Sequence, residues 1–388
     1  MNKLYHGKTE FALFMNMKTV VIIIPTYNES LVIEETIHQV FKATSTSTLS
    51  VHVLVFDSCS TDNTQDIVSN LQEIYPQLHL ITEPQKTGLG SAYLQAMRYA
   101  LTHLGADFIV EFDADLSHQP QYLLPIIEKM HTHDVVVASR YVKGGSIPQN
   151  WGWHRKLLSK LGNIVARIVL TPKYKDFTSG FRATHYLALN KALPEQFISN
   201  NYAYKLELLW ALHKTKAKIV EYPIEFVDRE KGQSKLPANS IFDSLRVLAT
   251  LRLYELKPYI SMCAVGLIGL VIQCLVYNAL RLNFTPFFAA QLAVIAATVN
   301  NFILNNQFTF KKRNLSQRFK SFAFFIGYSV LMVGFQGNWV RLGSNYFGTG
   351  YLKENLIMIS GVVLGSVLNY LFYSRLIWRE KRQHVILQ

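Results

Sequence analysis

Charge is scarce in this sequence, and negative charge is the scarcer kind. Charged residues make up 17% of the 388 residues, against about a quarter in ordinary soluble domains. Acidic residues number 26 against 39 basic ones, which gives a net charge of +13. This balance favours an anionic partner such as a nucleotide, a nucleic acid or an anionic lipid.

Cysteine is also rare, and the usual nucleophilic arrangements are missing. Cys59, Cys263 and Cys274 form no CxxC pair and no Cys/His cluster, so we expect neither a disulfide framework nor a zinc site. We find no Ser/His/Asp or Cys/His arrangement for covalent catalysis. Basic residues are not interleaved with aromatics in a patch, so we expect no nucleic-acid binding.

The C-terminal third is apolar and predicts a membrane domain. Residues 259–280 and 284–310 carry no charge, and a bilayer-spanning helix needs about 20 apolar residues. The alternative is a large buried helical core, but several such runs in series are hard to bury. We therefore predict an all-α transmembrane domain of four helices over 258–380, followed by a tail, 381–388. The spans are expected within 259–280, 284–310, 322–340 and 356–378.

Basic residues in the connecting segments predict the orientation of this domain. The segment 311–320 holds five basic residues, and 379–384 is also basic, whereas 281–284 and 341–355 carry few. Positive loops face the cytoplasm, so we predict a multi-pass membrane protein with its N-terminal domain and C-terminus on that side. The apolar stretch 12–17 is too short for a signal peptide.

Residues 18–237 alternate between strand-like and helix-like segments and follow an N-terminal extension, 1–17. The run 19–29 is rich in β-branched residues, as in a strand buried on both faces of a parallel sheet. This alternation predicts a doubly wound, Rossmann-like α/β domain whose ligands bind at the carboxyl ends of the strands. Strands are expected at 19–29, 50–57, 78–83 and 107–113, and helices at 31–43, 61–75 and 90–104.

Polar residues gather at three of these strand ends, and two carboxylates stand out. Asp113 and Asp115 are separated by Ala114 at the end of the fourth strand. Carboxylates are hard oxygen ligands that suit Mg²⁺ or Mn²⁺, which bind one or two carboxylates together with substrate phosphates. A solvated turn is the alternative for a lone pair of this kind. His118 follows, and we interpret it as a packing or capping residue.

Several motifs, in this order, resemble those of the inverting family-2 glycosyltransferases with a GT-A fold. Within that family they are similar to the polyprenyl-phosphate sugar transferases, the dolichol-phosphate mannose synthase group. The similarity covers about residues 18–240, and the apolar tail resembles a GtrA-like four-span module. The matching motifs are IPTYNE (24–29), DSCSTDNT (57–64), GLGSAYLQAM (88–97), DADLSHQP (113–120), SRYVKGG (139–145), RKLLSKLGN (155–163), DFTSGFRA (176–183) and REKGQSKL (229–236).

The resemblance implies a membrane-bound hexosyltransferase. It would move mannose or glucose from a nucleoside diphosphate sugar, GDP-mannose first and UDP-glucose next, to a polyprenyl or dolichyl phosphate. The reaction would be a metal-assisted inverting displacement with Mg²⁺ or Mn²⁺. The alternatives are a glycolipid flippase or transporter subunit, in which the soluble domain only regulates, and a polysaccharide synthase.

The resemblance also implies roles for individual residues. Asp113 and Asp115 would bind the metal and, with Arg140, form the catalytic set. Departures from the family pattern are Ser58, Asn63 and Ser117; Ser117 or water would complete the metal shell. The nucleotide sugar would contact Pro25, Tyr27, Glu29, Asp57, Asp113, Ala114, Asp115 and Arg140, and the acceptor phosphate Arg155, Ser179, Arg182, Arg229 and Lys235.

Two further segments have open interpretations. Apolar residues recur at near-helical spacing over 238–257, which indicates either a helix in the membrane interface or an ordinary packing helix. Glu207 lies on an expected helix and either orients substrate or forms a structural salt bridge. The oligomeric state is left open.

Overall fold

The structure is a computed structural model that describes residues 17–229, 239–304 and 315–372. These residues divide into two compact units, one ending at Arg252 and the other beginning at Leu253. Lys235, the basic segment 311–314 and the C-terminal tail lie outside the described residues. We call the first unit the catalytic unit and the second the membrane unit.

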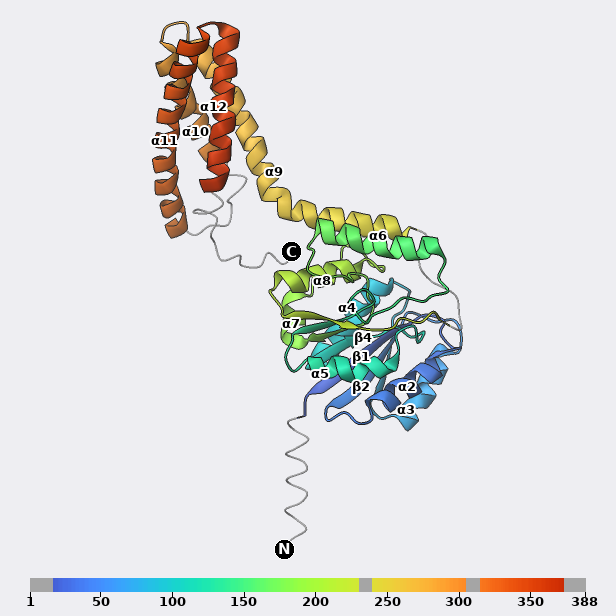
Figure 1. The fold of residues 1–388 in the computed structure, drawn as a ribbon. Helices are drawn as coiled ribbons and strands as arrows, with labels where there is room; N and C mark the ends of the chain where they lie inside the picture. The colour runs from blue at the N-terminus through green and yellow to red at the C-terminus, as the bar shows by residue number, and fades with distance from the viewer. Residues whose placement is uncertain (1–16, 230–238, 305–314, 373–388) are drawn as a thin grey trace. The chain divides into compact units, whose positions relative to one another are not determined.

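A seven-stranded mixed sheet forms the centre of the catalytic unit (Figure 1). Its strand order is β3-β2-β1-β4-β6-β5-β7. The first four strands are mutually parallel, whereas β6 runs antiparallel to both of its neighbours. The strands are β1 (Thr19–Thr26), β2 (Ser50–Asp57), β3 (Leu78–Thr82), β4 (Phe108–Glu111), β5 (Val135–Ser139), β6 (Arg182–His185) and β7 (Ile219–Pro223).

Helices cover both faces of this sheet, as the alternation predicts. The core on one face contains residues of α4, α6, α7 and α8, together with the first turns of α9. The other face is covered by α2, α3 and α5. The helices are α2 (Ile33–Thr44), α3 (Thr64–Ile74), α4 (Leu89–Thr102), α5 (Leu123–Lys129), α6 (Trp153–Val169), α7 (Tyr186–Ala192), α8 (Tyr204–Lys214) and α9 (Ser240–Leu280), with a 3₁₀ turn at Pro120–Tyr122.

The central strand β1 explains why both faces must be covered. Val21 and Ile23 lie in one core, whereas Ile22 and Ile24 lie in the other. This follows from the alternation of side chains along a strand. The predicted α/β fold is therefore confirmed, and the predicted strands are found close to their expected positions. The antiparallel strand β6 was not expected.

The membrane unit contains the rest of α9 and three further helices. These are α10 (Pro286–Leu304), α11 (Leu315–Phe347) and α12 (Tyr351–Phe372). Alanines of α10 pack against Tyr277, Val340 and Met358, which join α9, α11 and α12 in one small core. Of the described helices, one contains a stretch long and apolar enough to cross a membrane, Cys263–Leu280. The four-span count stays a prediction.

Polar contacts link the helices of the membrane unit at one end. Arg281 donates to Glu354 over 2.7 Å, and the Tyr277 hydroxyl donates to the same carboxylate over 2.9 Å. Asn278 and Asn355 exchange amide hydrogen bonds of 3.0 and 2.9 Å. In lipid such groups must find partners within the protein, so these contacts fix α9 against α12.

Candidate active site

Asp113 and Asp115 lie in a tight loop directly after β4. The loop is held to the sheet by the backbone of Phe112, which donates to Ile23 over 3.0 Å. The Thr36 hydroxyl of α2 donates to the carbonyl of Ala114 over 2.6 Å. Asp115 accepts the backbone N–H of Ser117 over 3.1 Å, as in an Asx turn. Both carboxylates are thus positioned by the strand end and by α2.

Cationic side chains surround these two carboxylates. Arg229 Nη2 lies 2.8 Å from Asp115 Oδ2, and His118 Nδ1 lies 3.3 Å from Asp113 Oδ2. Burial alone would raise the pKa of Asp113, but Lys205, His118 and Arg229 together hold that pKa well below its usual range. Asp113 therefore remains an anion throughout the physiological pH range.

The backbone at Gly180 packs directly against two of these charged groups, Lys205 and Asp113. A Cβ atom at Gly180 would lie 2.5 Å from Nζ of Lys205 and 2.8 Å from Oδ2 of Asp113. Any side chain there would displace the ammonium or the carboxylate. The cluster of Asp113, Asp115, Lys205 and Arg229 is called the charged cluster below.

The donor set at the charged cluster fits Mg²⁺ or Mn²⁺. Asp113 and Asp115 offer hard oxygen ligands, and these ions bind through one or two carboxylates plus substrate phosphates. No group of three or more His, Cys, Asp or Glu side chains suited to a metal occurs among the described residues.

The ends of β1 and β2 are joined by a network around Asp57. Its buried carboxylate accepts from the Thr26 hydroxyl over 2.8 Å and from Gln65 over 2.7 Å. It also accepts from the backbone and hydroxyl of Ser60 over 2.8 and 2.5 Å. The Asp57 carboxylate thus accepts hydrogen bonds from four donors of the protein, and these bonds fix the loop after β2. Nucleotide contact by Asp57 stays a prediction.

The loop after β1 faces the same network. Asn28, at a φ of 53°, accepts the N–H of Thr61 over 2.8 Å, and the N–H of Glu29 donates to Thr64 over 2.9 Å. The ammonium of Lys86 lies 3.4 Å from the centre of the Tyr27 ring, a cation–π contact. Pro25 is therefore the penultimate residue of β1, and Tyr27 and Glu29 are on the loop that follows it, next to the Asp57 network; their contact with the nucleotide stays a prediction.

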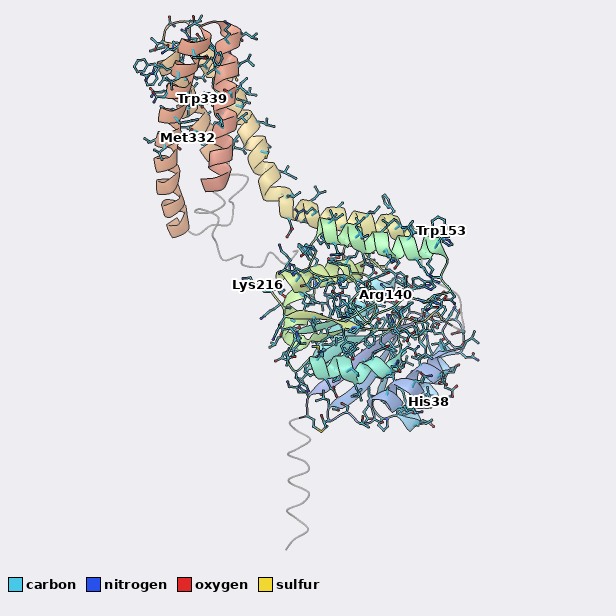
Figure 2. The ribbon with its side chains drawn as sticks, in the orientation of Figure 1. His38, Arg140, Trp153, Lys216, Met332 and Trp339 are labelled. Carbon is cyan, nitrogen blue, oxygen red and sulfur yellow. The ribbon has the colours of Figure 1, made fainter. Side chains whose placement is uncertain are left out.

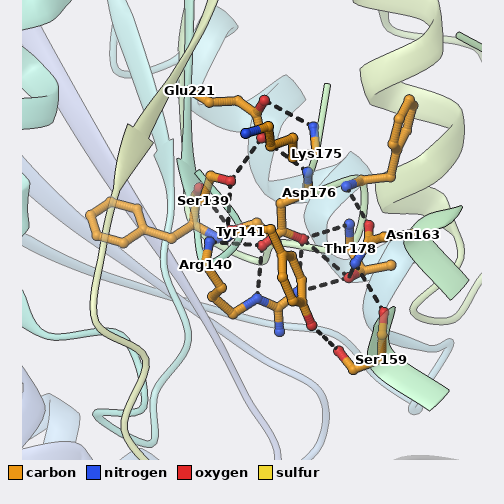
Figure 3. Close-up of polar contacts among 12 residues, drawn as sticks. Ser139, Arg140, Tyr141, Ser159, Asn163, Lys175, Asp176, Thr178 and Glu221 are labelled. Carbon is orange, nitrogen blue, oxygen red and sulfur yellow. Dashed lines mark hydrogen bonds and ion pairs between the residues drawn. The ribbon is translucent and has the colours of Figure 1, made fainter. Parts of the chain in front are cut away.

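Arg140 lies inside the catalytic unit and is paired with Asp176 (Figures 2 and 3). Its Nε and Nη2 donate to the two carboxylate oxygens over 2.8 Å each, and Nη2 also donates to Thr178 over 2.7 Å. Burial would raise the pKa of Asp176, but Arg140 lowers it. Arg140 thus fixes the 176–178 loop. A contact between Arg140 and the nucleotide sugar stays a prediction.

Glu221 holds the other side of this loop (Figure 3). It accepts the backbone N–H groups of Lys175 and Asp176 over 2.9 Å each, and the Ser139 hydroxyl over 2.8 Å. Asn163 of α6 accepts the N–H of Phe177 over 2.7 Å. The loop leading to Ser179 and Gly180 is therefore anchored to β5, β7 and α6 before it reaches the charged cluster.

The predicted acceptor residues are dispersed, and Arg182 requires a correction. Arg182 is 2% exposed and lies on β6, opposite Glu111 of β4. Its Nε and Nη2 donate to the Glu111 carboxylate over 2.6 and 2.8 Å, and the Tyr204 hydroxyl donates to it over 2.8 Å. A side chain enclosed in this way cannot reach a lipid phosphate. Breaking such a buried pair costs about 3–5 kcal/mol.

The other acceptor candidates lie closer to the surface or to the charged cluster. Arg155 of α6 is half-exposed, with Nη1 3.3 Å from both carboxylate oxygens of Asp228. Its guanidinium also lies 3.9 Å from the Trp151 ring centre. Because Asp228 precedes Arg229, Arg155 comes near the segment that enters the charged cluster. The Ser179 hydroxyl donates to the Phe181 carbonyl over 3.3 Å.

Lys205 and Tyr202 were not predicted, although both lie at the charged cluster. Burial and the charge of Asp113 raise the pKa of Tyr202 to about 12. Lys205 is buried at the start of α8. The sequence feature that could have indicated Lys205 is a lysine at the start of a largely apolar helix, in the sequence YKLELLW. The structure also places His118 among the rings of Phe112, Phe181 and Phe226, in agreement with a packing role.

Comparisons with known proteins identify the family of this chain. Residues 21–193 match glycosyl transferase family 2, and residues 262–378 match the GtrA/DPMS transmembrane domain. The chain is thus a glycosyltransferase with a membrane domain. A dolichol-phosphate mannosyltransferase from Pyrococcus furiosus is 31% identical over 92% of this chain and 98% of its own length. The chain belongs to the family of that enzyme.

Two further similarities were found. An undecaprenyl-phosphate mannosyltransferase from Micrococcus luteus is 35% identical over 58% of this chain and 90% of its own length. A glucosyl-3-phosphoglycerate synthase from Mycobacterium tuberculosis, solved with Mn²⁺, UDP and glucosyl-3-phosphoglycerate, is 19% identical with a TM-score of 0.43. The aligned part covers 62% of this chain and 80% of that chain.

Glu207 is a buried acid, and we expected it either to orient substrate or to form a structural salt bridge. It is 1% exposed, its Oε2 accepts the N–H of Ile198 over 2.7 Å, and its Oε1 has no hydrogen-bond partner. Neither a salt bridge nor a contact with the charged cluster is found for it among the described residues. Burial raises the pKa of Glu207 to about 7.

Glu207→Gln should make the stability of the protein less dependent on pH. The folded-state pKa lies above the unfolded value of about 4.3, so the wild type loses stability as pH rises from about 4 to 7. Gln keeps the acceptor for Ile198 without that charge. We expect the variant to gain about 2–3 kcal/mol over wild type between pH 5 and 8.

Denaturation midpoints in detergent at pH 5 and pH 8 would measure this gain. The exposed Glu128→Gln on α5 is the matched control, since it removes the same charge without relieving burial. An equal pH dependence for wild type and Glu207→Gln would contradict the assignment.

Proposed function

We propose that this enzyme transfers mannose from a nucleoside diphosphate mannose to a polyprenyl or dolichyl phosphate. The observation that carries the proposal is the charged cluster, in a chain whose second unit matches a transmembrane domain. Two phosphate-bearing substrates must approach each other there, which requires cations on the protein. The names of the relatives from P. furiosus and M. luteus support mannose and a polyprenyl phosphate.

Charge neutralisation is the main task of such a site. Asp113 and Asp115 would hold Mg²⁺ or Mn²⁺, which neutralises charge on the departing diphosphate. Lys205 and Arg229 lie beside these carboxylates and are proposed to bind the substrate phosphates. Arg grips phosphate through two parallel hydrogen bonds, whereas Lys acts as a point charge.

A strong general base is not required for this reaction. The acceptor is a phosphate monoester, whose second pKa is about 6, so it is largely a dianion at neutral pH. Its oxygen can attack the anomeric carbon directly while the diphosphate leaves from the opposite face. The protein's task is therefore to align the two substrates and to exclude water. GDP-mannose is the favoured donor.

The acceptor has to reach the site from a membrane, and α6 carries a suitable apolar face. Trp153 and Ile168, near the two ends of α6, are 77% and 79% exposed, and Figure 2 shows Trp153 at the outer surface. Leu157, Leu161 and Ile164 continue the exposed stripe at helical spacing. Such a stripe beside basic residues is typical of a helix that lies in a membrane interface.

The first part of α9 has the same character and supports the predicted interfacial segment 238–257. Ile241, Phe242 and Leu245 are exposed, whereas Val247 and Leu248 are buried in the catalytic unit. With α6, these residues would hold the charged cluster near the depth of the lipid phosphates. We further propose that the catalytic unit and the C-terminus face the cytoplasm, because of the basic segments 311–320 and 379–384.

Asp115→Asn should abolish most transfer. The substitution removes one charged metal ligand, which is also the carboxylate that pairs with Arg229. We expect a loss of about two orders of magnitude, as for other electrostatic groups at a developing charge. Transfer of radiolabelled mannose under limiting Mn²⁺, and Mn²⁺ binding by calorimetry with nucleotide present, would measure it. Asp66→Asn, exposed on α3, is the control; near-normal turnover of Asp115→Asn would refute the metal assignment.

Arg155→Ala should weaken acceptor binding while leaving nucleotide binding intact. A charge-assisted hydrogen bond is worth about 1.5–3 kcal/mol, so the acceptor KM should rise about 10- to 100-fold. Kinetics with polyprenyl phosphate and nucleotide calorimetry separate the two effects. Lys156→Ala is the matched control, because its ammonium donates to the Gln149 carbonyl instead. Lost nucleotide affinity with an unchanged acceptor KM would show that Arg155 belongs to the donor pocket.

A reporter fused after Gln388 should be read on the cytoplasmic side, and one inserted within 344–350 on the external side. The expectation follows from the excess of Lys and Arg in 311–320 and 379–384. Protease protection of the same insertions gives an independent measurement. Cleavage within 311–320 from the external side would overturn the orientation.

A further inference from the structure

The loop 198–202 between α7 and α8 packs tightly against the start of α4. The N–H of Gly90 donates to the Asn200 carbonyl over 2.7 Å. A Cβ at Gly88 would lie 2.4 Å from the Asn200 carbonyl oxygen, and one at Gly90 would lie 2.8 Å from that of Ser199. Gly88 also has a φ of 109°, which disfavours other residues. The loop and the start of α4 therefore fix each other's positions.

Two carboxylates from different helices hold the opposite side of this loop. Glu207 of α8 accepts the N–H of Ile198 over 2.7 Å. The buried Ser199 hydroxyl donates to the carboxylate of Asp243 on α9, and the same hydroxyl accepts the N–H of Asn201 over 3.0 Å. Ser199 is thus the point at which α9 is attached to the loop by a charge-assisted hydrogen bond.

The same loop leads directly into the charged cluster. Tyr202 is its last residue, and Lys205 lies three residues later at the start of α8. The ammonium of Lys205 is adjacent to Asp113, because both would contact a Cβ at Gly180. A shift of the loop would therefore move the cation that balances Asp113.

α9 is well placed to set the position of this loop. Val247, Leu248 and Leu251 are buried in the same core as Ala203 and Leu206. Only Asp243, one turn before them, forms the polar contact with Ser199 among the hydrogen bonds described for this helix and the loop. Apolar packing holds the helix against the unit, whereas the Asp243–Ser199 bond ties the loop to the helix.

We propose that Asp243 is a positioning residue for the transfer reaction. Through Ser199 it holds the loop 198–202 in the conformation that places Lys205 against Asp113. The proposal rests on the transferase function above. It assigns to the first turn of α9 a role in the chemistry of the site, in addition to any role in attaching the enzyme to a membrane.

Full-length Asp243→Ala and Ser199→Ala, with the double variant, test this role. We expect faster amide hydrogen exchange at Gly90, Ile198 and Asn201 in each single variant, and no further increase in the double variant. For transfer we expect kcat to fall about tenfold, the loss that corresponds to about 1.4 kcal/mol, with an acceptor KM within about twofold of wild type.

Two variants control for a merely structural effect. Ser244→Ala removes a hydroxyl from the next residue of α9, which within the described residues donates to the Ser240 carbonyl of the same helix. This variant should leave exchange and kcat unchanged. Asp243→Asn keeps an acceptor oxygen for Ser199 and should restore most of kcat. A structural role alone would lower the folded fraction and leave kcat per folded enzyme unchanged.

Exchange and transfer separate the two hypotheses. If exchange at these amides in Asp243→Ala equals that of wild type, the positioning role is refuted whatever the enzyme transfers. If exchange rises but kcat per folded enzyme does not fall, the loop does not position Lys205 for transfer and the proposal is also refuted. If wild type transfers no mannose while exchange responds as expected, it is the proposed function that fails.

Discussion

Carboxylates brought together at the end of a sheet repel one another, and they stay ionised there only where cations accompany them. Asp113 and Asp115 are balanced by Lys205 and Arg229, and similar pairs recur deeper in the unit, between Arg140 and Asp176 and between Arg182 and Glu111. We propose the first set as the site of the substrate phosphates, whereas the other two pairs are internal and join elements of the fold.

The internal pairs determine where the open set can form. Arg182 and Glu111 join β6 to β4 immediately before Asp113, so they fix the antiparallel strand whose preceding loop holds Gly180. Arg140 and Asp176 fix the other end of that loop. Gly180 then brings the loop within contact of both Lys205 and Asp113. Buried pairs of this kind are costly to desolvate, and their contribution here is to the geometry of the site.

Local patterns were sufficient to predict much of the fold, but not the pairing of distant residues. The β-branched run of β1, the strand–helix alternation and the position of Asp113 and Asp115 follow from periodicity and from the order of elements. Arg182 resembled a phosphate ligand because its motif contains no sign of Glu111, which lies 71 residues away. Lys205 was missed for the same reason: its partner Asp113 is distant in sequence, and a lone lysine on an apolar helix has no recognisable spacing.

Because β1 is buried on both faces of the folded sheet, its apolar side chains are exposed while the chain is being synthesised. Its sequence TVVIIIPT is uncharged and rich in β-branched residues, the composition of segments that aggregate when exposed. One neighbour, β2, follows soon, but β4 arrives much later: Thr19 bonds to Asp107, 88 residues further on. At about 5–20 residues per second, β1 remains exposed on that edge for about 4–18 s during translation. Protection of that edge of β1 in the interval falls to the ribosome and to chaperones.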